Sequence, residues 1–142
     1  MSVLRLLLDT NVVLDLLLAR SEFDKAAVIL ATKAAQGEIV AYLSATSVTT
    51  VHYIARKTLG SGGADLAVSK LLDLFHVAPV TDVVLRSALA RAFDDFEDAV
   101  IDAAAEHVGV DAIVTRDAAG FKSSSHRVFT PPEMVQALMA RG

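Results

Sequence analysis

Three aspartates from distant parts of the chain stand beside predicted buried elements. Asp9 follows a short apolar run at residues 3–8, and Asp117 lies two residues beyond a second run at 112–115. Asp98 opens a mostly apolar helix. Short apolar runs are typical of buried parallel strands, and ligands bind at the carboxyl ends of such strands. Since converging carboxylates repel one another until a hard cation neutralises them, the pattern predicts a Mg²⁺ or Mn²⁺ site formed by Asp9, Asp98 and Asp117.

Three further polar side chains are predicted to support this site. We expect Asn11 to hydrogen-bond a ligand of the cation, and Thr115 to orient Asp117 through its hydroxyl. Asp95 precedes Asp98 by three residues, so the two share a helix face. The proposed ions, one or two in number, would orient water and stabilise charge on a scissile phosphate.

Each acid also has a simpler interpretation. Asp9, Thr10 and Asn11 form an ordinary strand-to-helix turn in which one side chain caps the helix. Asp117 fits a turn in which it pairs with a neighbouring arginine. The helix dipole alone favours the acids near the predicted helix start, namely Asp94, Asp95 and Glu97. The coincidence of three acids at one predicted sheet edge favours a shared site over these separate explanations.

Basic side chains near the last apolar run are candidates for contacts with flanking phosphates. Such contacts position a nucleic acid without reading its bases. The candidates in and beyond the loop are Arg116, Lys122, His126 and Arg127, and Arg56 with Lys57 ends an earlier predicted helix. Ordinary solvated surface charge is an equally good explanation of all six.

Composition restricts the class of protein. The chain has 142 residues, 54% of them hydrophobic, and is predicted to form one domain over residues 1–142. It has no cysteine, which excludes disulfides and thiolate metal sites. The net charge of −4 argues against nucleic-acid binding through overall positive charge, although it suits a basic partner. With no export signal and no apolar stretch long enough for a membrane span, the expected location is the cytoplasm, without membrane contact.

The order of predicted elements indicates an α/β fold. Strands and helices alternate, which favours a parallel sheet with helices on both faces. Gly60-Ser61-Gly62-Gly63 is the clearest break. Strands are expected at 3–8, 39–43, 77–80, 112–115 and 128–129. Helices are expected at 12–19, from a cap at Ser21 to a stop at Gly37, and at 47–59, 64–75, 82–93, 96–108 and 133–140.

Four sequence blocks resemble the PIN-domain family, in particular the VapC-type toxin ribonucleases of type II toxin–antitoxin pairs. The blocks are Leu7-Leu8-Asp9-Thr10-Asn11-Val12, Ser44-Ala45-Thr46-Ser47-Val48, Asp95-Phe96-Glu97-Asp98-Ala99, and Thr115-Arg116-Asp117 with Phe121. The resemblance implies a three-layer α/β/α domain whose parallel sheet has about five strands in the order 3-2-1-4-5. It also implies Mg²⁺- or Mn²⁺-dependent cleavage of RNA, and a homodimer held inactive by a small antitoxin protein.

One position departs from the family pattern and leaves other functions open. The second block usually carries a glutamate where this chain has Thr50, a weaker neutral ligand that is expected to lie beside the site. The first alternative is therefore a non-catalytic PIN-like module that binds RNA or a partner through a weakened metal site. The second is a receiver- or phosphatase-like acidic α/β domain, although the second acid expected two residues after Asp9 is absent.

Overall fold

The computed structural model describes residues 3–20 and 22–141. Its centre is a parallel sheet of five strands in the order β3-β2-β1-β4-β5, as predicted. The strands are β1 (Leu4–Leu8), β2 (Ile39–Ser44), β3 (His76–Ala78), β4 (Ala112–Val114) and β5 (Arg127–Phe129). Buried side chains alternate between the two faces of β1, with Leu6 and Leu8 on one face and Leu7 on the other.

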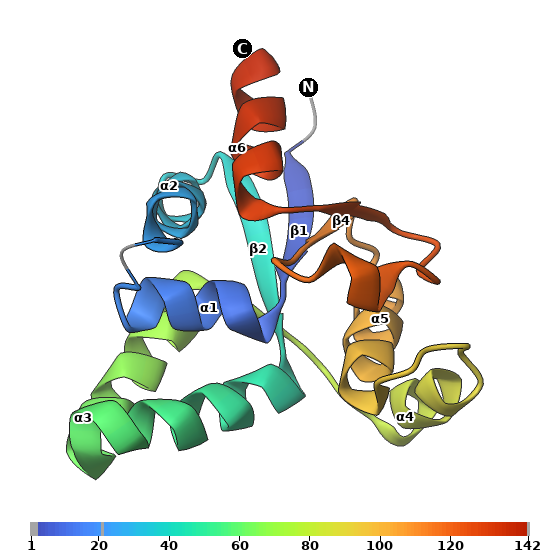
Figure 1. Ribbon diagram of the computed structural model, residues 1–142, viewed down its shortest axis with the longest axis horizontal. Coiled ribbons are helices and arrows are strands. Elements are labelled where there is room, and N and C mark those ends of the chain that lie inside the picture. Colours follow the sequence, from blue (N-terminus) through green and yellow to red (C-terminus); the bar gives the residue numbers. More distant parts are fainter. Residues whose placement is uncertain (1–2, 21, 142) are drawn as a thin grey trace.

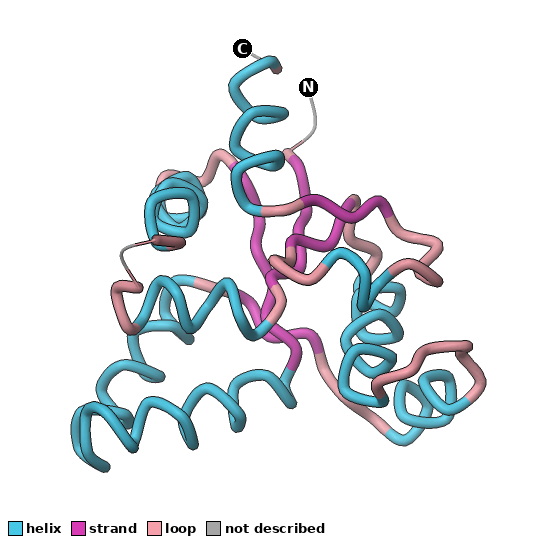
Figure 2. The backbone as a smooth tube through the Cα atoms, in the orientation of Figure 1, coloured by secondary structure: helices cyan, strands magenta, loops and turns pink. Residues whose placement is uncertain are grey.

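Helices cover both faces of the sheet, which gives the predicted three layers (Figures 1 and 2). The apolar core on one face is closed by α1 (Thr10–Leu17), α2 (Asp24–Ala35), α3 (Ala45–Leu74) and α6 (Pro131–Ala140). The core on the other face is closed by α4 (Asp82–Leu89), α5 (Phe96–Val108) and the short 3₁₀ helix η1 (Ala118–Phe121). Within the described residues, no helix combines the length and apolar character that a membrane crossing requires.

Local signals account for several helix ends. Asp95 caps the start of α5, and Gly109 ends it in the left-handed conformation with φ of 70°. Thr130 and Glu133 form a capping box at the start of α6. The cap predicted at Ser21 lies outside the described residues, and the structure starts α2 at Asp24.

The glycine-rich segment bends a helix and does not separate two helices by a loop. Only Gly60 leaves helical geometry, with φ of 74° and ψ of 170°, and the chain resumes a helix at once. The two halves of α3 therefore run in different directions (Figure 1). His52 Nε2 and Asp65 Oδ1 are 2.6 Å apart and connect the halves across the bend.

Candidate active site

Parallel pairing of β1 with β4 places Asp9 beside Thr115. Leu8 is in register with Val114, so the next residue of each strand stands at the same carboxyl edge of the sheet. The Asp9 backbone N–H donates to the Val114 carbonyl at 2.9 Å, which extends this pairing by one residue. The Thr115 hydroxyl donates to Asp9 Oδ2 at 2.7 Å. Side chains 106 positions apart are thus joined by a buried hydrogen bond.

Thr115 and Asn11 form a polar support beneath the aspartates. Thr115 Oγ1 accepts from the Asp117 backbone N–H at 3.0 Å, which fixes the start of the loop that carries Asp117. Asn11 Nδ2 donates to Asp9 Oδ2 at 3.3 Å, and its Oδ1 accepts from the Arg116 backbone N–H at 3.2 Å. Asp9 is itself the cap of α1, because its Oδ1 accepts from the Thr10 backbone N–H. The simple capping role and the site role therefore coexist at Asp9.

Asp98 and Asp117 approach each other around Gly120. Asp95 Oδ1 accepts from the Asp98 backbone N–H at 3.0 Å and fixes the first turn of α5. Asp117 caps η1, and its Oδ1 accepts from the Gly120 backbone N–H at 3.3 Å. A β-carbon placed on Gly120 would lie 2.8 Å from Asp117 Oδ2 and 2.9 Å from Asp98 Oδ2. Both carboxylates therefore border one small space that only glycine leaves open.

Burial and neighbouring negative charges raise the pKa values of Asp9 and Asp98. Burial contributes most to the raised pKa of Asp98, and the charges of Asp9, Asp95, Asp117 and Glu97 raise it in the same direction, to about 7 from 3.8. Burial also raises the pKa of Asp9, although hydrogen bonds from Thr115 and Thr10 oppose this effect. The acids therefore form one interacting electrostatic cluster, the condition that a bound cation relieves.

The raised pKa of Asp98 predicts a pH-dependent stability in the absence of metal. The folded state holds a proton on Asp98 between about pH 4 and pH 7, whereas the unfolded state has lost it, so the free energy of unfolding falls as the pH rises through this window. Allowing for solvent screening, we expect a loss of about 1–2 kcal/mol between pH 5 and pH 8. Urea unfolding in EDTA at pH 5 and at pH 8 measures this difference in the free energy of unfolding. In Asp98→Asn this component should vanish, and an identical pH response in the two proteins would contradict the prediction.

The donor chemistry of the cluster fits a hard divalent cation. All the candidate ligands are carboxylate oxygens, which Mg²⁺ and Mn²⁺ prefer. The space beside Gly120 separates two of these carboxylates. Among residues 3–20 and 22–141, however, no three acidic, histidine or cysteine side chains already lie close enough to form a complete ligand set. Coordination by Asp9, Asp98 and Asp117 therefore requires the side chains to draw together.

Glu97 is exposed, as expected of a solvated acid at a helix start, and it also interacts electrostatically with the acids of this cluster. Partial burial, followed by the charges of Asp95 and Asp9, raises its pKa. The Thr10 hydroxyl, which also donates to Ser47 at 2.8 Å, lies 3.5 Å from Glu97 Oε1. The sequence signal for this role of Glu97 is its position directly before Asp98 in the third block.

Thr50 takes no comparable position. Its hydroxyl donates to the Thr46 carbonyl at 3.3 Å, within α3. Hydroxyls on helices commonly bond to the preceding turn in this way. The structure therefore gives Thr50 a helix-internal contact, and among the described residues its hydroxyl forms no hydrogen bond with the acids of the site.

The structure separates the predicted phosphate contacts from one another. Arg116 binds the fully buried Asp15, with Nε 2.6 Å from Oδ2 and Nη2 3.2 Å from Oδ1, and its guanidinium stacks on Phe23. Its charge is therefore already paired. Lys122 is exposed directly after η1, which is compatible with the predicted contact.

Arg127 lies at the wrong end of the sheet for the predicted role. It opens β5 in register with Ala112, whereas the acids follow the carboxyl ends of the strands. It also borders a cavity with Leu4, at the opposite end of β1 from Asp9. Strand register therefore corrects its assignment as a substrate contact, which sequence proximity to Asp117 had suggested.

Fold and site together define a class of protein. A doubly wound parallel sheet with acidic side chains at its carboxyl edge is an α/β domain with a candidate cation site. The sequence matches the family described as PIN domain over residues 5–119. The chain therefore belongs to the PIN-domain family, which confirms the resemblance found in the four blocks. Comparison with curated proteins gives no significant match.

Solved structures of toxin–antitoxin proteins share the fold. DNA-bound VapBC from Salmonella typhimurium has a TM-score of 0.67 and 18% identity over 90% of this chain and 98% of that chain. A toxin–antitoxin complex from Klebsiella pneumoniae has a TM-score of 0.64 and 21% identity, covering 88% and 96%. VapC20 from Mycobacterium tuberculosis, a toxin that cleaves the sarcin-ricin loop, has a TM-score of 0.61 and 19% identity, covering 76% and 86%.

Proposed function

We propose that this protein is a Mg²⁺- or Mn²⁺-dependent ribonuclease and the toxin of a type II toxin–antitoxin pair. The observation that carries the proposal is the approach of Asp98 and Asp117 to one space beside Gly120, within an electrostatic cluster that includes Asp9. Membership of the PIN-domain family and the shared fold of VapC proteins support it.

The residues of the site divide into ligands and supports. Asp9, Asp98 and Asp117 would hold the cation, which supplies positive charge to activate water and stabilise the phosphate in the transition state. Thr115 and Asn11 fix the orientation of Asp9 through their hydrogen bonds. Asp95 holds the turn that presents Asp98. The exposed Lys122 is a proposed contact with RNA phosphates.

The proposed partners follow from the same family assignment. The toxin–antitoxin complex from Klebsiella pneumoniae supports a small antitoxin protein as the partner of this chain. The net charge of −4 suits a basic partner segment. We place the protein in the cytoplasm as a homodimer, each copy formed by a single domain over residues 1–142.

Cation binding tests this proposal before any RNA target is known. Mn²⁺ should raise the melting temperature, because it binds only the folded state. At a concentration 100 times its Kd it should add about 2.7 kcal/mol to the free energy of unfolding. Asp98→Asn should abolish the rise. If Mn²⁺ leaves the melting temperature of the wild type unchanged, the proposal is wrong. Mn²⁺ binding without cleavage of any RNA in a total RNA digest would instead favour the binding-only module.

A further inference from the structure

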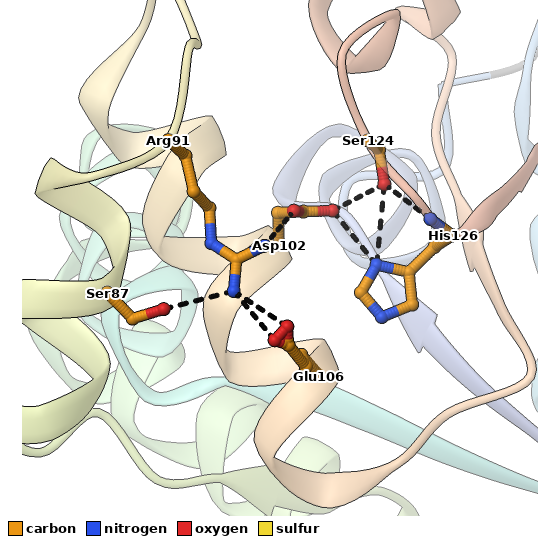
Figure 3. A network of polar contacts seen from close by, with 6 residues as sticks. All are labelled: Ser87, Arg91, Asp102, Glu106, Ser124 and His126. Atoms are coloured by element: carbon orange, nitrogen blue, oxygen red, sulfur yellow. Dashed lines mark hydrogen bonds and ion pairs between the residues drawn. The ribbon is translucent and has the colours of Figure 1, made fainter.

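A second polar network is centred on Asp102, which lies on α5, the helix that also carries Asp98. Asp102 follows Asp98 by four residues in α5, and its side chain is 1% exposed. Asp102 Oδ2 accepts from Arg91 Nη1 at 2.8 Å, and its Oδ1 accepts from the Ser124 hydroxyl at 2.5 Å. Figure 3 shows the Asp102 carboxylate between Arg91 on one side and Ser124 with His126 on the other. Both carboxylate oxygens are therefore bound.

Each partner of Asp102 is itself fixed. Arg91 Nη2 donates to Ser87 Oγ at 3.1 Å and to Glu106 Oε1 at 3.1 Å, which anchors Arg91 to α4 and α5. Ser124 Oγ accepts from the His126 backbone N–H at 3.0 Å, and His126 Nδ1 lies 3.0 Å from Asp102 Oδ1. A buried carboxylate with this many partners is satisfied, and the arrangement ties the loop after η1 to α5.

The same loop determines where Asp117 lies. The Ser124 backbone N–H donates to the Phe121 carbonyl at 2.9 Å, so Ser124 closes the turn that follows η1. Phe121 is 2% exposed and packs edge-to-face on Phe93 at 5.9 Å between ring centroids. Between Asp117 and this anchored end lies Gly120, which the carboxylates of Asp98 and Asp117 approach so closely that a β-carbon would not fit. A small shift of η1 would therefore change the spacing of those carboxylates.

We propose that Ser124 and Asp102 are positioning residues that hold η1 against α5 and thereby set the separation of Asp117 from Asp98. This inference rests on the proposed function, since it concerns the same cation site. Among the described residues, the side chains of Asp102 and Ser124 hydrogen-bond to Arg91, His126 and each other, and not to the carboxylates of the proposed cation site. They act through Phe121 and the η1 backbone.

Ser124→Ala tests the inference, and the neighbouring Ser123 offers a matched control. Ser123 is exposed and forms none of the hydrogen bonds described for the loop, so Ser123→Ala should behave like the wild type. Ser124→Ala should weaken Mn²⁺ affinity about tenfold by isothermal titration calorimetry. Without metal, it should also speed hydrogen exchange of the amides at residues 117–124. Ser124→Thr keeps the hydroxyl and should restore both properties.

A second variant covers the case in which water replaces the lost hydroxyl. Asp102→Asn removes the charge that holds Arg91 and weakens the anchor to Ser124, so it should reduce Mn²⁺ affinity at least as much. If the wild type binds Mn²⁺ and both variants bind it equally well, the inference is wrong while the nuclease proposal stands. If the wild type itself does not bind Mn²⁺, the nuclease proposal fails, and the inference fails with it.

Discussion

Asp98→Asn should reduce metal-dependent RNA cleavage by about 100- to 1,000-fold, the cost of removing one preorganised electrostatic group from an active site. The amide keeps the size of the carboxyl group but not its charge, so the cation loses a ligand. Asp98 borders the space beside Gly120 and interacts with every other acid of the cluster. Initial rates on a labelled RNA with saturating Mn²⁺ measure the effect.

The stability of the same variant separates a chemical role from a structural one. Asp98→Asn removes repulsion from the metal-free cluster, so its free energy of unfolding at pH 8 should equal or exceed that of the wild type. Asp82→Asn, at an exposed ion pair with Arg86 on α4, is the control and should cleave RNA normally. Cleavage by Asp98→Asn at the wild-type rate would refute the assignment of Asp98 as a ligand.

Gly120→Ala should reduce cleavage by about 100-fold, because a displacement of about 1 Å in an active site can cost that much. The new methyl group would lie 2.8 Å from Asp117 Oδ2 and 2.9 Å from Asp98 Oδ2, so the carboxylates would have to move apart. Gly120 has no positive φ angle, so alanine brings no backbone strain. Cleavage rates and the Mn²⁺ dissociation constant should therefore change far more than stability does.

Gly62→Ala provides the matched control for this substitution. Gly62 is also helical, and a β-carbon there would meet no atom within 4 Å. We expect this variant to cleave RNA at the wild-type rate and to be slightly more stable, as alanine restricts the unfolded chain. Equal activity of Gly120→Ala and the wild type would show that the space beside Gly120 has no role in catalysis.

The parts of the fold that sequence alone predicted are those governed by local signals. The helix at 96–108 begins and ends as expected, because Asp95 supplies a cap and Gly109 adopts a conformation that glycine favours. The apolar runs before Asp9 and around Ile113 form adjacent strands, since both are buried on two faces. Strand order came from the family resemblance and is confirmed.

Tertiary contacts explain where the sequence predictions were wrong. The helix expected to reach Phe93 ends at Leu89, because Arg91 turns toward Asp102 and the Phe93 ring packs on Phe121. Likewise, Arg116 pairs with Asp15, which lies 101 positions away. No pattern within a short window of sequence contains these partners.

The candidate site was predictable only in outline for the same reason. Asp9, Asp98 and Asp117 were selected because each adjoins a recognisable strand or helix, and their role as ligands stays a prediction. Glu97 is exposed, as expected of a solvated acid at a helix start, but its contact with Thr10, which is 87 positions away, could not be inferred from local sequence. Arg127 was misplaced because the pairing register of β5 cannot be inferred from its own three residues.

The central position of β1 in the sheet has a consequence for the chain during its synthesis. β1 is synthesised before β2 and β4 but lies between them in the sheet, and Asp9 is supported by Thr115. A nascent polypeptide that has not yet emerged from the ribosome as far as η1 lacks both Asp117 and the partner strand of Asp9. The acidic cluster can therefore assemble only after the segment that carries Thr115 and Asp117 has been synthesised, more than 100 residues after Asp9.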